Sequence, residues 1–217
     1  MVEYRKDKVK IFLNELEEVK KIETEKDLQK YFEGLAITLF NQIDILAGKD
    51  RYSLAEIEFY YQNAIFKDGQ YKDTYARTKT AGSLFWHLSG IDICFESNEK
   101  EGYFGGILIR ALEREDINNP NNPRPQFGGP LTCKDEVLNT ATEKCVVEIC
   151  KDQEYHVNPK PLIRKGLDKS KENDSYLNKE YRFFREDIKS PITRKVDSFK
   201  FNTNELKKET IDRKYYF

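Results

Sequence analysis

The stretch Leu54–Tyr60 reads LAEIEFY and alternates apolar side chains with two carboxylates. Successive side chains of a β-strand point to opposite faces, so Glu56, Glu58 and Tyr60 would share one face while the apolar residues between them pack on the other. Such alternation is typical of the exposed face of an antiparallel sheet, and it equally suits the wall of an active site. The stretch therefore predicts a strand that carries two carboxylates on one face.

An arginine stands inside a second apolar run, where residues 105–113 read GGILIRALE. A strand of this composition is expected to be buried, and a buried guanidinium needs a defined partner because removing a charge from water is costly. We therefore expect Arg110 to have a carboxylate partner.

The rest of the chain combines helical and strand-like patterns. Apolar residues recur at helical spacing over 9–19 and 28–39, which predicts two packing helices. Strand-like runs bounded by turn residues follow at 52–61, 83–95, 105–113, 145–150 and 179–185. The Asn-, Pro- and Gly-rich segment 118–130 predicts a long surface loop. We predict an α+β fold with one compact domain at 1–189 and a charged, aromatic-containing arm at 190–217.

Charge is balanced overall and uneven along the chain. The 37 basic and 38 acidic residues give a formal charge of −1, which argues against a polybasic nucleic-acid coat or a membrane-surface protein. Residues 1–159 carry 21 Lys+Arg against 28 Asp+Glu, or −7, while residues 160–217 carry 16 against 10, or +6. This basic C-terminal quarter could present a face to a polyanion, and it could equally be a solvated surface.

Neither export nor metal binding is expected from the sequence. The N-terminus is charged, and nowhere do about 18 apolar residues run together, so we expect a cytoplasmic protein without a membrane span. Cys94, Cys133, Cys145 and Cys150 contain no C-x-x-C pair and read as reduced thiols, and a zinc site built with His156 is not expected. Glycine-rich nucleotide-binding motifs are missing too, so no cofactor is predicted.

Several segments together resemble the alkyladenine (3-methyladenine) DNA glycosylase family. EIEFY at 56–60 followed by GGILIRALE at 105–113 is similar to the family's ETEAY strand and the VLIRALEP strand some fifty residues later. Further similar segments, spread over residues 28–186, are YFEGLAITLF at 31–40, GSLFWHL at 82–88, GGP at 128–130, RKGL at 164–167 and KEYRFF at 179–184. Any one of these motifs is weak, and their shared order carries the resemblance. It implies a compact, single-domain mixed fold with a curved, mainly antiparallel sheet and packing helices.

The resemblance also implies roles for individual residues. Glu58 falls on the acid that activates the hydrolytic water, and Arg110 on the strand arginine that would hold this water and the carboxylate. The implied base-binding residues are Tyr60, Tyr75, and either Trp86 or His87, between which the alignment of one strand leaves the choice open. Arg164, Lys165 and Arg182 are the implied contacts to the DNA backbone. No metal is implied, and we expect a monomer whose partner is damaged DNA.

Two positions depart from the family pattern. Ser89 stands where a bulky tyrosine wedges into the minor groove, and Glu96 stands where family members usually have an asparagine. Three hypotheses follow. The chain is a monofunctional DNA glycosylase for alkylated or deaminated purines, a hydrolase of the same fold for single-stranded nucleic acid or nucleosides, or a binding module that has lost turnover.

Overall fold

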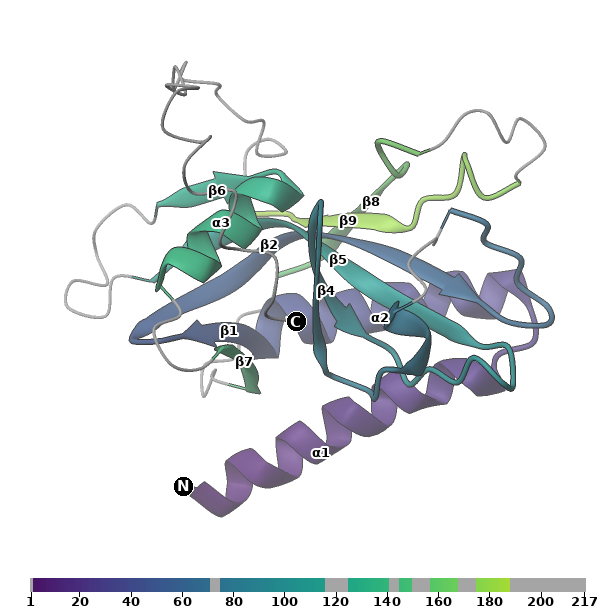
Figure 1. The fold of residues 1–217 in the computed structure, drawn as a ribbon, viewed down its shortest axis with the longest axis horizontal. Helices are drawn as coiled ribbons and strands as arrows, with labels where there is room; N and C mark the ends of the chain where they lie inside the picture. The colour runs from purple at the N-terminus through teal and green to yellow at the C-terminus, as the bar shows by residue number, and fades with distance from the viewer. Residues whose placement is uncertain are drawn as a thin grey trace, which may run out of the picture.

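The computed structural model describes residues 2–70, 75–115, 125–140, 145–149, 157–167 and 175–187. These residues form a mixed α+β structure built around an open sheet, and every strand pairing among them is antiparallel (Figure 1). The predicted α+β class is confirmed. The arm expected at 190–217 lies outside the described residues.

Three of the described helices precede the strands in the chain, and two lie between strands. In chain order they are α1 (Val2–Glu18), the 3₁₀-helix η1 (Val19–Lys21), α2 (Glu25–Gln42), the 3₁₀-helix η2 (Tyr75–Thr78) and α3 (Pro130–Thr140). Thr24 caps α2, since its hydroxyl accepts a hydrogen bond from the Asp27 N–H at 3.1 Å. Pro130 is the first residue of α3, where the backbone N–H that proline lacks would have no partner within the helix. Among the described residues, no helix combines the length and apolarity needed to cross a membrane.

The strands form one sheet whose main order is β3-β4-β5-β2-β1-β7. In addition, β6 pairs with β5, and β9 pairs with both β2 and β8. Their bounds are β1 (Ile43–Ala47), β2 (Asp50–Gln62), β3 (Leu84–His87), β4 (Gly90–Cys94), β5 (Phe104–Arg114), β6 (Gln126–Gly128), β7 (Cys145–Ile149), β8 (Pro159–Leu162) and β9 (Arg182–Arg185). The two runs that decide the fold are therefore neighbours at the centre, since β2 contains LAEIEFY and β5 contains GGILIRALE.

The pairing of β2 with β5 is irregular between Leu54 and Ile57. Leu54 lies opposite Leu112 and Ile57 opposite Ile109, and between them the register shifts at Ala55 on β2 and shifts back at Arg110 on β5. At this irregularity both Leu54 and Ile57 reach the core although they are three positions apart. Beyond it, strict alternation returns.

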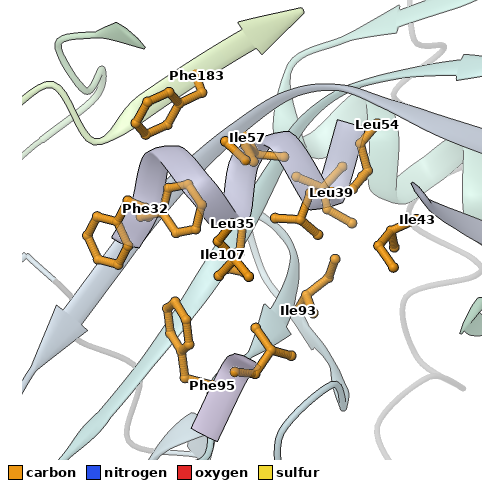
Figure 2. Packing of buried hydrophobic residues seen from close by; sticks show 14 of the residues in the cluster. Phe32, Leu35, Leu39, Ile43, Leu54, Ile57, Ile93, Phe95, Ile107 and Phe183 are labelled. Atoms are coloured by element: carbon orange, nitrogen blue, oxygen red, sulfur yellow. The ribbon is translucent and has the colours of Figure 1, made fainter. Parts of the chain in front are cut away.

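One face of the sheet carries the hydrophobic core. Figure 2 shows side chains of α2 pointing at strand residues, with Phe32, Leu35 and Leu39 packed toward Ile57 and Ile107. The Phe32 ring stacks on the buried Phe59 ring at a centroid distance of 4.5 Å. Helix α1 supplies further buried residues to the same cluster, namely Phe12 and Leu16. The opposite face of β2 is left for Glu56, Glu58 and Tyr60.

Three expectations about local structure differ from the fold. The run 83–95 is a hairpin, because Leu88 and Ser89 form a turn between β3 and β4. Short strands β1, β6 and β8 were not predicted. The segment 118–130 is not a continuous loop, since β6 occupies Gln126–Gly128 and α3 begins at Pro130; its residues 118–124 lie outside the described part of the chain.

Candidate active site

Two carboxylates and two arginines meet on the face of the sheet that turns away from the core. Arg110 bridges the acids, with its Nη1 atom 3.0 Å from Glu58 Oε2 and its Nε atom 3.0 Å from Glu56 Oε1. Arg182 approaches from β9, and its Nε atom lies 3.1 Å from the same Glu56 oxygen. The side chains of Glu56 and Arg182 are 7% and 3% exposed. The cluster is therefore buried and, as a group of two acids and two bases, formally neutral.

Glu58 is the most enclosed member of the cluster. Its side chain is 0% exposed, and its two oxygens are held by different donors. The Tyr60 hydroxyl donates to Oε1, while the Lys165 N–H donates to Oε2 at 3.3 Å. Burial raises the pKa of Glu58 above its ordinary value, and the Arg110 guanidinium opposes that rise in pKa. A carboxylate with a raised pKa and fixed oxygens suits a general base.

Tyr60 lies beside Glu58 at the edge of a small apolar cluster. It packs against buried Phe85, Cys94 and Phe104, and it remains partly exposed. The Arg164 guanidinium lies over its ring, 4.9 Å from the centroid. Burial raises the pKa of the Tyr60 phenol above its ordinary value, so the phenol stays protonated and can donate to Glu58. Its partly exposed ring is an aromatic surface next to the carboxylate.

The three basic residues expected at the DNA backbone have different surroundings. As whole residues, Arg164 and Arg182 are 4% and 2% exposed. Arg164 is paired with Asp68, and Arg182 is paired with Glu56. As phosphate contacts these two residues do not fit the structure, because their guanidinium groups are already neutralised and out of reach of solvent. Lys165 is exposed. These three residues of the basic C-terminal quarter therefore lie near Glu58, but two of them are buried and form ion pairs with acids.

The structure separates the two alternatives Trp86 and His87. Trp86 packs against the core cluster, so it is on the face opposite to Glu58. Phe85, Asp92, Leu108 and Glu58 are paired in succession across four strands, so they share one face of the sheet. His87 lies two positions after Phe85 in β3 and therefore points to that same face. Three strand spacings separate β3 from β2, which places His87 roughly 14 Å from the Glu58 strand.

Neighbouring side chains fix the orientation of His87. Its ring stacks on Phe85 at 5.6 Å, its Nε2 atom lies 3.2 Å from Asp92 Oδ1, and its Nδ1 atom lies 3.1 Å from Ser89 Oγ. The imidazole edge is therefore occupied by two polar partners. His87 does not contact the Glu58 cluster, and any ligand touching both would have to extend across the sheet.

Tyr75 begins η2, and its side chain lies outside the part of the chain whose side chains the structure describes. Cys94 and Cys133 are buried free thiols. Cys150 and His156 lie outside the described residues. Within the described ranges, no group of three or more His, Cys, Asp or Glu side chains could hold a metal ion.

Sequence reasoning did not find two residues, Asp68 beside the site and Leu88 in the β3–β4 hairpin. Asp68 pairs with Arg164 through two hydrogen bonds of 2.6 and 3.1 Å, but a lone aspartate in a loop gives no signal in the sequence. Leu88 is 92% exposed at the tip of the β3–β4 hairpin. Its neighbour Ser89 is the residue that stands at the position of the family's bulky wedge. The run 83–95 was predicted as one continuous strand, so no turn was expected at Leu88 and its exposure had no signal in the sequence.

No protein-family model matches the sequence, and no curated protein sequence matches it either.

Proposed function

We propose that this chain is a monofunctional DNA glycosylase that hydrolyses the N-glycosidic bond of alkylated or deaminated purines. The observation that carries the proposal is the Glu58 carboxylate, which is fully buried and held by Arg110, Tyr60 and the Lys165 N–H. The antiparallel sheet and the order of the resembling segments support the same family, whose finer fold remains part of the proposal.

The proposed chemistry begins with water attacking the sugar carbon while the C–N bond breaks. Glu58 takes the proton of the water, and the departing base keeps the electron pair of the broken bond. Positive charge develops on the sugar in this step, and a nearby carboxylate stabilises it. An alkylated purine is already a good leaving group, so one base suffices.

The donors around Glu58 indicate where the water would be bound. An ionised carboxylate offers about four acceptor positions. Arg110 forms an ion pair with Oε2, the Lys165 N–H donates to the same oxygen, and Tyr60 donates to Oε1. We assign the water to the second acceptor position of Oε1. Because Glu58 is fully buried, this assignment requires Tyr60 or Arg110 to move as the base enters.

Activity should rise with pH along a limb displaced above the ordinary pKa of a glutamate, 4.5, because the base form of Glu58 is required and burial raises its pKa. Tyr60→Phe should displace this limb to still higher pH, because it removes a hydrogen bond that lowers the pKa of Glu58. The measurement is kcat/KM for base release against pH. Tyr61→Phe is the matched control, because Tyr61 is the adjacent tyrosine on the core face. If the rising limb of kcat/KM stays at the same pH in Tyr60→Phe, the role of Glu58 as the general base is contradicted.

Leu88 is the residue that would fill the space left by a flipped base in a duplex. Unstacking a base costs a few kcal/mol, which bulky apolar side chains offset. Leu88→Ala should therefore lower base release from duplex DNA by about tenfold or more, and leave release from single-stranded DNA unchanged. Leu138→Ala, at an exposed leucine of α3, is the control.

A panel of duplex DNA, single-stranded DNA and free nucleosides separates the three hypotheses. Release mainly from duplex DNA, reduced by Leu88→Ala, supports the glycosylase. Equal release from single strands or nucleosides, with no effect of Leu88→Ala, supports the second hypothesis. Binding without release supports a module that has lost turnover.

A further inference from the structure

Arg164 and Asp68 form an ion pair in which both side chains are 0% exposed. The guanidinium donates to both carboxylate oxygens, with its Nη1 atom 2.6 Å from Oδ2 and its Nη2 atom 3.1 Å from Oδ1. Such a bidentate contact fixes direction as well as distance, because the guanidinium fork and the carboxylate must be coplanar. The pair therefore defines the position of the two chain segments that carry it.

The same guanidinium ties further segments to β2. It donates to the Phe59 carbonyl at 3.3 Å and to the Tyr176 carbonyl at 2.8 Å. Asp68 belongs to the loop after β2, Arg164 follows β8, and Tyr176 precedes β9. Two loops that are far apart in sequence, the one after β2 and the one between β8 and β9, thus converge on Phe59, the strand residue next to Glu58.

Two contacts connect this pair directly to the candidate active site. The residue after Arg164 is Lys165, whose N–H donates to Glu58 Oε2 at 3.3 Å. Arg164 itself lies 4.9 Å from the centroid of the Tyr60 ring, and Tyr60 donates to the other oxygen of Glu58. Both oxygens of Glu58 are consequently held by groups that Arg164 positions.

We propose that Asp68 and Arg164 are positioning residues for Glu58, which act by holding the Lys165 N–H and the Tyr60 ring in place against its carboxylate. The effect on Glu58 geometry follows from the contacts alone, whereas the effect on catalysis rests on the proposed function. A purely structural purpose explains the pair less well, because two apolar side chains of similar volume stabilise a fold as well as a buried ion pair or better. What apolar residues lack is the directional hold on the loop.

The test uses the full chain and two variants that break the pair differently. Asp68→Asn keeps the shape and removes the charge, while Arg164→Lys keeps the charge and removes the planar fork. In the unaltered chain, the NMR shift of the Lys165 amide proton should follow the ionisation of Glu58, and Glu58→Gln identifies that dependence by removing it. In both folded variants we expect the dependence to disappear and the Lys165 amide to exchange with solvent about tenfold faster, as expected for one lost hydrogen bond.

Glu113→Gln is the matched control, because Glu113 is also a buried carboxylate paired with an arginine, with Arg185 Nη1 at 2.8 Å. Its ion pair is separate from the contacts that hold Glu58. We expect the Lys165 signal to be unchanged in this control. Persistence of the dependence in folded Asp68→Asn and Arg164→Lys would overturn the proposal, as would its loss in Glu113→Gln. If one of the two variants does not fold, the other gives the same readout.

A kinetic measurement separates this proposal from the proposed function. Base release by Asp68→Asn and Arg164→Lys should fall mainly in kcat, by up to about 100-fold, because a displaced general base slows the reaction step more than the shifted Tyr60 ring weakens substrate binding. If the unaltered chain releases no base from any substrate, the proposed function fails, and the Lys165 signal still decides whether the pair positions Glu58.

Discussion

Arg110→Met is expected to lower the free energy of unfolding by about 3–5 kcal/mol, because it leaves two buried carboxylates without their shared cation. Arg110 lies 3.0 Å from an oxygen of Glu56 and 3.0 Å from an oxygen of Glu58, whose side chains are 7% and 0% exposed. Urea unfolding followed by circular dichroism measures the loss. The methionine preserves much of the arginine's volume, so the loss reflects charge more than a cavity.

Two further variants test this explanation. Arg114→Met removes an arginine of the same strand whose ion pair with Glu136 is 37% exposed on the arginine side, and it should cost less than about 1 kcal/mol. Adding Glu58→Gln to Arg110→Met should recover much of the stability, since Glu56 keeps Arg182 as its partner and no uncompensated charge then remains buried. Equal losses for Arg110→Met and Arg114→Met would contradict the buried cluster.

Glu58→Gln is expected to reduce base release by about 10²- to 10⁴-fold, the range typical of a lost general base. Glutamine has nearly the same shape and cannot take a proton from water, so the change isolates the chemistry. Single-turnover release of free base from damaged DNA is the measurement.

Glu56→Gln is the natural comparison for Glu58→Gln, because both acids contact Arg110 and lie on one face of β2. Only Glu58 also accepts hydrogen bonds from Tyr60 and the Lys165 N–H. We therefore expect Glu56→Gln to lose less than about tenfold in activity. The assignment of the base to Glu58 fails if the two variants are equally impaired.

Alternation in LAEIEFY was sufficient to predict the two faces of the central strand. A lone arginine in GGILIRALE was likewise sufficient to predict a carboxylate partner, and the structure supplies two, Glu56 and Glu58. Both inferences rest on local rules, namely the two-residue period of a strand and the cost of burying a charge. The register shifts at Ala55 and Arg110 could not be predicted, because such an irregularity is defined only by how the two strands pair.

Features that depend on distant partners were missed. Arg164 and Arg182 were expected to face DNA phosphates, yet their acids, Asp68 and Glu56, lie 96 and 126 positions away in sequence, and residue spacing does not reveal such pairs. Strand β8 was hidden by Pro159 and Pro161, which cannot donate to a ladder. Prolines are tolerated there because β9 is the only strand that β8 pairs with among the described residues.

The most direct test of the glycosylase proposal is to incubate the full chain with a duplex that contains one 3-methyladenine or hypoxanthine, and to quantify the free base and abasic sites. The proposal predicts that both form in equal amounts, with activity that rises with pH along a limb above 4.5. A duplex that is bound by the chain and recovered with every base in place, across the whole pH range, would contradict it.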